Sequence, residues 1–104
     1  MFHCKENHIP KLYETDGIPF EKKIIYQKWD LKKVNFYWLI AELDKNKNLA
    51  FGYANLNNDN FAEWGCIDLQ ELVDNNAEPD RSWKICTFEQ AQTIIHKQKQ
   101  MCQK

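Results

Sequence analysis

The chain has 104 residues, a formal net charge of −1 and 43% hydrophobic residues, enough to form the core of one domain. The near-neutral charge gives no domain-wide basic balance that would argue for nucleic-acid binding, and no uncharged run approaches the roughly 20 apolar residues that span a bilayer. The four cysteines form no CxxC pair: they are Cys4, Cys66, Cys86 and Cys102. Because no apolar segment follows Met1 either, we expect a cytoplasmic protein without disulfides, bound metal or cofactor.

The first third of the chain predicts an arm, a turn and one strand. Residues 1–20 show no clear hydrophobic period, and the sequence TDGIP at positions 15–19 is typical of a turn. Residues 23–30 alternate loosely between apolar and polar side chains, which predicts a strand. The polar residues 31–34 then predict a turn into the next strand.

Residues 35–55 predict a β-hairpin, because two aromatic and β-branched runs flank the Asp/Lys/Asn segment 44–48. With a three-residue loop, one face of the hairpin would belong to the core; it would carry Tyr37, Leu39, Ala41, Leu43, Leu49, Phe51 and Tyr53. The other face would set the large Phe36, Trp38 and Ile40 against the small Ala50, Gly52 and Ala54. That face would either seat a helix or form a shallow aromatic groove, and a different loop length would change the pairing.

The second half predicts a loop at residues 55–60, a strand at 61–67 with a bulge or close backbone approach at Gly65, and an edge strand at 82–86. A Glu or Gln stands three residues after Asp68 and three residues after Thr87. This capping-box pattern predicts that a helix begins at each position. The predicted fold is a single α+β domain over residues 1–104, with an arm and turn at 1–20, an antiparallel meander at 23–67 and helices and an edge strand at 68–104.

The predicted sheet is mainly antiparallel and has four to five strands, with a short helix and a C-terminal helix packed on one face. We expect one core between the sheet and the C-terminal helix. Its predicted members are Leu39, Leu43, Leu49, Phe51, Ile67, Leu72, Phe88, Ala91 and Ile95.

Several segments resemble the prokaryotic and phage family catalogued as domain of unknown function 2958. They are IPKLYETDGIPFEKKIIY, FYWLIAELD, LAFGYA, AEWGCIDLQEL and the later Asp80-Arg81, and the similarity covers residues 9–73. The family occurs on plasmids, integrative elements and phages, and it lends no catalytic residue. The resemblance implies a mobile-element setting, with a role against host defences or in maintenance of the element.

Several residues are of types that could bind a metal or take part in catalysis, but they form no known metal-binding or catalytic motif. His3, Cys4 and His8 are zinc-ligand types, which His96 or Cys102 would have to complete, yet their spacing matches no standard zinc site. Cys66 is expected to be a buried core thiol rather than a nucleophile. Glu42 and Glu63 would form a carboxylate pair if adjacent strands brought them together, although ordinary solvent-facing carboxylates explain them as well. We predict no catalytic residue and no metal site.

The charge distribution carries the functional hypothesis. Residues 61–80 contain six acidic residues and no Lys or Arg, and aromatic rings lie near them in the sequence. The predicted partner-binding residues are Glu63, Trp64, Asp68, Glu71, Asp74, Glu78, Asp80, Trp38 and Tyr53. We expect a non-enzymatic module, a monomer or weak dimer, that regulates or inhibits a host protein with a basic surface. The alternatives are a small-ligand or nucleotide-binding protein that uses the aromatic groove and, third, a minor hydrolase.

Overall fold

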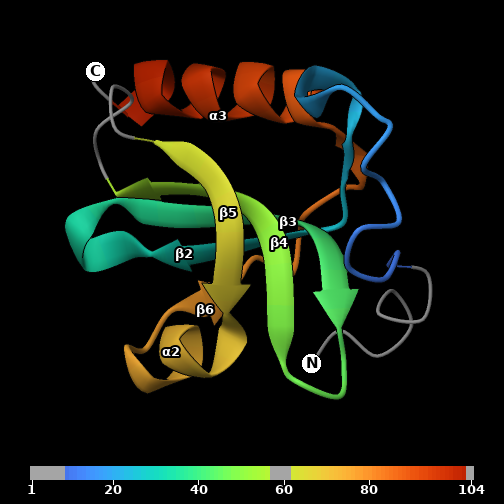
Figure 1. Cartoon of the computed structure of the whole chain (residues 1–104). Coiled ribbons are helices and arrows are strands. Elements are labelled where there is room, and N and C mark those ends of the chain that lie inside the picture. The colour runs from blue at the N-terminus through green and yellow to red at the C-terminus, as the bar shows by residue number, and fades with distance from the viewer. Residues whose placement is uncertain (1–8, 57–61, 103–104) are drawn as a thin grey trace.

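The structure, a computed structural model, describes residues 9–56 and 62–102. Five strands form an antiparallel sheet in the order β5-β4-β3-β2-β6, and the pair β1-β7 forms a second, smaller sheet (Figure 1). The strands are β1 (Ile24–Ile25), β2 (Gln27–Leu31), β3 (Phe36–Asp44), β4 (Leu49–Leu56), β5 (Glu63–Asp68), β6 (Glu78–Pro79) and β7 (Cys86–Thr87). The helices are α2 (Leu69–Asp74), α3 (Phe88–Cys102) and the short 3₁₀ turns η1 (Phe20–Lys22) and η2 (Lys32–Val34). The predicted α+β class with a mainly antiparallel sheet is confirmed.

The first predicted strand is divided between the two sheets. Tyr26 separates β1 from β2 and donates its backbone N–H to the Ile40 carbonyl at 2.9 Å. The predicted edge strand at 82–86 is shorter than expected, since only Cys86 and Thr87 pair with β1. Trp83 lies outside any strand and is buried, with its indole N–H donated to the Ile25 carbonyl at 3.1 Å.

The hairpin between β3 and β4 has a longer loop than the sequence predicts. Asp44 pairs with Leu49 instead of Asn48, and the Asp44 carboxylate accepts the backbone N–H of Asn46 at 3.0 Å. Further along, the pairing register shifts between Ile40 and Glu42, which places an extra residue, a β-bulge, in β3. The predicted three-residue loop is therefore wrong, and the bulge turns Leu43 to the face opposite Leu39.

Gly52, and not Gly65, is the glycine that a close backbone approach requires. A Cβ atom at position 52 would lie 1.9 Å from the Leu39 carbonyl oxygen, whereas a Cβ at Gly65 would meet nothing within 4 Å. No register shift occurs at Gly65 in the pairing of β4 with β5. The bulge is thus not at Gly65, as predicted, but in the neighbouring strand pair, where it lies in β3 opposite Gly52.

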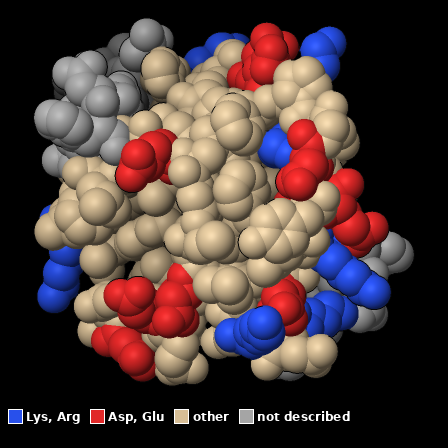
Figure 2. Space-filling model, viewed as in Figure 1, with Lys and Arg blue, Asp and Glu red and all other residues tan. Residues whose placement is uncertain are grey.

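Both predicted helix starts are confirmed. The Asp68 carboxylate accepts the backbone N–H groups of Gln70 at 2.9 Å and Glu71 at 3.4 Å, which caps α2. Thr87 and Gln90 exchange side-chain hydrogen bonds with each other's backbone N–H groups at 3.0 and 3.2 Å, which begins α3. Figure 2 shows that acidic side chains gather over α2.

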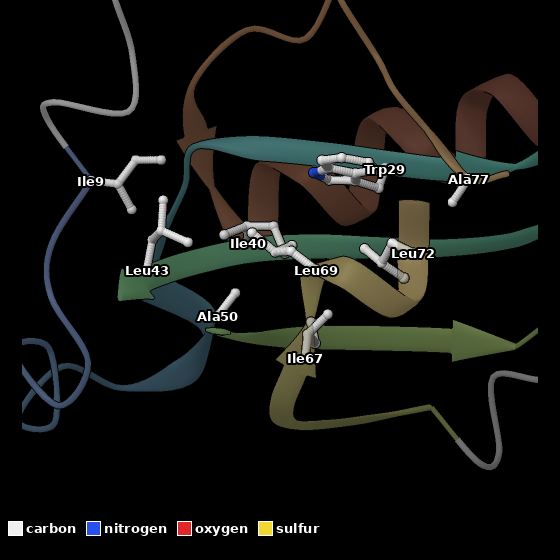
Figure 3. Close-up of a cluster of buried hydrophobic side chains, with 9 residues drawn as sticks. All are labelled: Ile9, Trp29, Ile40, Leu43, Ala50, Ile67, Leu69, Leu72 and Ala77. Atoms are coloured by element: carbon white, nitrogen blue, oxygen red, sulfur yellow. The ribbon is translucent and has the colours of Figure 1, made fainter. Parts of the chain in front are cut away.

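Two apolar clusters cover the two faces of the sheet, so the prediction of a single core is wrong. The cluster beside α2 contains Ile9, Trp29, Ile40, Leu43, Ala50, Ile67, Leu69, Leu72 and Ala77 (Figure 3). The cluster beneath α3 contains Ile25, Tyr37, Leu39, Ala41, Trp83, Ala91 and Ile95. Because Leu39 and Ile40 are neighbours on one strand, their side chains point to opposite faces. The two helices therefore lie on opposite faces rather than on one, and Leu49, Phe51 and Phe88 are only half-buried.

We predict that both clusters are needed for stability. Leu39→Ala and Ile40→Ala each remove a side chain with 0% exposure. Each should lower the free energy of unfolding by about 2–5 kcal/mol, the usual cost of a large-to-small core substitution. Ile94→Ala, at a position exposed on α3, is the control and should change it by less than about 0.5 kcal/mol. Urea unfolding measures all three, and a near-neutral Ile40→Ala would show that the α2 side is not a core.

Candidate functional site

Four of the acidic residues predicted to bind a partner follow one another from the end of β5 through α2 to β6. Asp68, Glu71, Asp74 and Glu78 are all exposed. In the ranges 9–56 and 62–102 none of these four carboxylates is ion-paired with Lys or Arg. Asp68 also caps α2, and Asp74 accepts a hydrogen bond from the Gln70 amide at 3.0 Å. The segment thus presents negative charge that no cation of the described chain neutralises.

Asp80 has a structural role in the turn that follows β6. It is half-buried, and its carboxylate accepts the Ser82 backbone N–H at 2.9 Å and the Ser82 hydroxyl at 2.6 Å. Its own backbone N–H is donated to the Lys28 carbonyl at 2.8 Å. The Asp80 carboxylate therefore holds its own turn and is less available to a partner than the carboxylates of α2.

Trp38 lies on the same face of the sheet as α2. Glu63, Ala54, Trp38, Trp29 and Pro79 form one row of paired residues across the five strands. Trp38 is half-buried and packs against the cluster beside α2, with its ring edge-on to Phe36 at 6.3 Å between centroids. The structure therefore brings Trp38, Glu63 and the acidic residues of α2 to one face.

Trp64 and Tyr53 lie on the opposite face, with α3. Trp64 stacks on Phe20 at 4.8 Å between ring centroids, and its ring is 4.9 Å from Phe88 and 6.0 Å from Tyr53. Tyr53 in turn lies 4.8 Å from Phe88. These two predicted site residues thus belong to a separate aromatic cluster, made of Phe20, Phe51, Tyr53, Trp64 and Phe88. Sequence order could not separate the two groups, because residues adjacent along a strand face opposite ways.

The face over Ala50, Gly52 and Ala54 seats a helix. Ala50 has 0% exposure and shares its cluster with Leu69 and Leu72 of α2. The sequence predicted either a seat for a helix or an aromatic groove on this face, and the structure has the helix α2 at the Ala50 end. Only Ala54, which is half-buried beside Trp38, lies toward the other end.

Glu42 and Glu63 do not form a carboxylate pair. Glu42 pairs with Phe51 near one end of β4, whereas Glu63 pairs with Ala54 near the other end. Glu42 has 2% exposure, and its carboxylate accepts the backbone N–H groups of Tyr13 at 2.7 Å and Thr15 at 3.0 Å, as well as the Thr15 hydroxyl.

Thr15 joins Glu42 to a second buried charge. Lys23, which has 2% exposure, donates from Nζ to the Thr15 hydroxyl at 2.7 Å and to the Thr15 carbonyl. A buried carboxylate and a buried ammonium are tolerated only when they are hydrogen-bonded in this way. The sequence analysis did not predict this network. Its one signal in the sequence is Glu42, a Glu inside an apolar strand, which indicates a buried polar contact but does not identify the partner.

A pocket of about 70 Å³ lies beside this network and is lined by Leu12, Tyr13, Asp16, Glu42, Phe51 and Cys66. It has room for a few water molecules. Cys66 is exposed, so the prediction of a buried core thiol is wrong: its side chain lies on the outer strand β5, next to Phe51. Cys86 is the more protected of the two described thiols, and burial raises its pKa.

No metal site is visible in the described ranges. They contain no group of three His, Cys, Asp or Glu side chains that could hold an ion. The candidate ligands His3, Cys4 and His8 lie outside the described residues, as does the side chain of Cys102, and His96 is exposed on α3. Within the same ranges, no helix is both long and apolar enough to cross a membrane.

Comparisons with known proteins add no relative to this description. No protein-family model matches the chain, and neither a curated protein nor a solved structure does. The resemblance to domain of unknown function 2958 therefore stays a prediction, and the functional argument rests on the chain's own geometry.

We predict that Glu42 holds residues 13–15 against the sheet. Glu42→Ala would leave two backbone N–H groups and a hydroxyl without an acceptor and should cost about 2–4 kcal/mol of unfolding free energy. Limited proteolysis should then cut faster near residues 11–18. Glu21→Ala, an exposed carboxylate in η1, is the matched control and should behave as the wild type. Equal stability of the two variants would contradict the assigned role.

The two described thiols should differ in reactivity. Cys66 is exposed, whereas the raised pKa of Cys86 leaves less thiolate at any pH below it. Iodoacetamide at pH 8 should therefore alkylate Cys66 first, as measured by mass spectrometry of tryptic peptides over time. In urea the two rates should converge, and a faster Cys86 in the folded protein would contradict the assigned burial.

Proposed function

We propose that this chain is a non-enzymatic binding module whose acidic α2–β6 surface docks on a basic surface of a protein partner. The acidic α2–β6 surface consists of Asp68, Glu71, Asp74 and Glu78, together with Glu63 and Trp38. Glu63 and Trp38 share a face with α2, whereas Glu78, on the edge strand β6, pairs with Asp30 in the neighbouring row. One observation carries the proposal: the carboxylates on α2 and β6 are exposed and lack cationic partners in the described chain. Complementary charge of this kind raises the association rate and makes it salt-dependent.

The half-buried Trp38 supplies the apolar part of this surface. Aromatic rings at the border of a charged patch are common binding anchors, because they bury large areas at low cost in conformational entropy. Trp38 is held by its contacts with Phe36 and with the cluster beside α2. Charge would thus govern the encounter with the partner, while Trp38 would govern its dissociation.

The biological role follows from the resemblance stated above and is part of the same proposal. A small module from a phage or another mobile element would act in the host cytoplasm, as a monomer or weak dimer. It would inhibit or regulate a host protein, and a defence protein with a nucleic-acid-binding surface fits best, because such surfaces are basic.

We predict that neutralising the acidic α2–β6 surface weakens binding without unfolding the protein. The test variant combines Glu71→Gln, Asp74→Asn and Glu78→Gln and leaves the helix cap Asp68 in place. Exposed carboxylates contribute little to stability, so its melting temperature should stay close to that of the wild type. Its on-rate for a partner captured from bacterial lysate should fall, and the remaining affinity should depend less on salt.

The matched control removes the same charge elsewhere, through Asp16→Asn, Glu21→Gln and Glu89→Gln, all of them exposed. It should bind with nearly wild-type rates at every salt concentration. Equal on-rates for the wild type and the Glu71/Asp74/Glu78 variant at low salt would refute the docking role and reduce this surface to an aid to solubility.

A further inference from the structure

β5 forms an edge of the five-stranded sheet and pairs with β4 on one side only (Figure 1). Immediately after this strand, Leu69 donates its backbone N–H to the Asn48 carbonyl at 3.1 Å. Hydrogen bonding to the neighbour alternates along an antiparallel strand, so the backbone N–H and C=O groups of Trp64 and Cys66 point away from β4. Over the described ranges, no hydrogen bond from outside the β4–β5 pair reaches either residue.

This edge lacks the features that usually protect an exposed strand. Natural sheets block their edges with proline, lysine, bulges or very short strands. β5 pairs with β4 over six residues in unbroken register, and its sequence, EWGCID, contains neither proline nor lysine. Gly65 in the middle of the strand has no described atom within 4 Å of its Cβ position. The β5 edge thus carries none of these protective features within the strand itself.

The charges of β5 indicate which strand the edge accepts. Its two ends are acidic and exposed, at Glu63 and Asp68, while the residues between them are uncharged. A second copy of β5 would bring two further carboxylates and no Lys or Arg to this edge. Like charges gathered on paired strands repel one another, whereas opposite charges on paired strands attract. The edge therefore disfavours a second copy of itself and favours a strand with basic ends.

We propose that the β5 edge binds an extended segment of a basic protein partner as a sixth, antiparallel strand. The backbone groups of Trp64 and Cys66 would hydrogen-bond the segment, and Lys or Arg side chains of the segment would lie opposite Glu63 and Asp68. Strand addition of this kind takes its affinity from main-chain hydrogen bonds and its specificity from alternate side chains. The inference rests on the proposed function, for which it names the form of the bound segment. Figure 2 shows a mostly uncharged surface over β4 and β5, next to the acidic side chains over α2.

The probe is a capped six-residue peptide with lysine at both ends and alternating valine and threonine between them. In an NMR titration we expect saturable shifts at residues 63–68, together with slower hydrogen exchange of the Trp64 and Cys66 amides. A peptide with glutamate at both ends is the charge control and should not bind. The same lysine peptide, N-methylated on the amides that face β5, should not bind either, and this comparison needs no protein variant.

Cys66→Pro tests the edge directly, because proline removes an outward N–H that β4 does not use. It should weaken the lysine peptide at least about tenfold, equivalent to about 1.4 kcal/mol. Cys66→Thr keeps the N–H and should bind as the wild type does. The proposal is overturned if no shift is seen at about 1 mM lysine peptide, if the N-methylated peptide binds equally well, or if the protein instead dimerises through β5.

The two proposals fail in different ways. Binding that Cys66→Pro abolishes but the Glu71/Asp74/Glu78 variant retains, at any salt concentration, would support the edge and count against the acidic α2–β6 surface. Binding that the Glu71/Asp74/Glu78 variant loses but Cys66→Pro retains would overturn the edge proposal and leave the acidic α2–β6 surface as the docking site.

Discussion

The β-bulge in β3 sets the arrangement of side chains around the sheet. The register shift between Ile40 and Glu42 inserts one residue opposite Gly52, where the Leu39 carbonyl approaches so closely that only glycine fits. As a result, Leu39 and Ala41 lie in the cluster beneath α3, while Ile40 and Leu43 lie in the cluster beside α2. Without the extra residue, strict alternation would turn Leu43 toward the α3 side and empty part of the α2 side. The glycine and the bulge thus allow one strand to serve two cores.

The bulge also delivers Glu42 to the residues that need an acceptor. Glu42 pairs with Phe51, and its carboxylate meets the backbone of residues 13–15. Because Thr15 also accepts from Lys23, one threonine connects the segment before the sheet to both a buried anion and a buried cation. Leaving any of these buried groups without a hydrogen-bond partner would cost more free energy than the hydrogen bond contributes to stability when it is formed. The network therefore fixes where the segment lies, even though its net contribution to stability is modest.

The described surface divides into regions with different chemistry. One face carries α2, its unpaired carboxylates and the half-buried Trp38; the opposite face carries α3 and the aromatic cluster around Trp64. The β5 edge lies between the two faces and has acidic residues at both ends. A basic partner that extends a strand along this edge would have the acidic α2–β6 surface within reach, because α2 follows β5 directly in the chain. The carboxylates of α2 and the β5 edge are thus neighbours because their residues are consecutive in the chain, and not because of a long-range contact.

The sequence by itself determined the local features, because each depends on residues close together in the chain. The caps at Asp68 and Thr87, the hairpin at 35–55 and the α+β class all follow from short-range patterns, and the structure confirms them. Tertiary structure alone decided the features that depend on pairing between strands. The position of the bulge depends on how closely Leu39 approaches Gly52, and the burial of Glu42 depends on residues 27 and 29 positions away in the chain. The separation of Trp38 from Trp64 also needed the register, because a shift of one residue moves a side chain to the other face of a sheet.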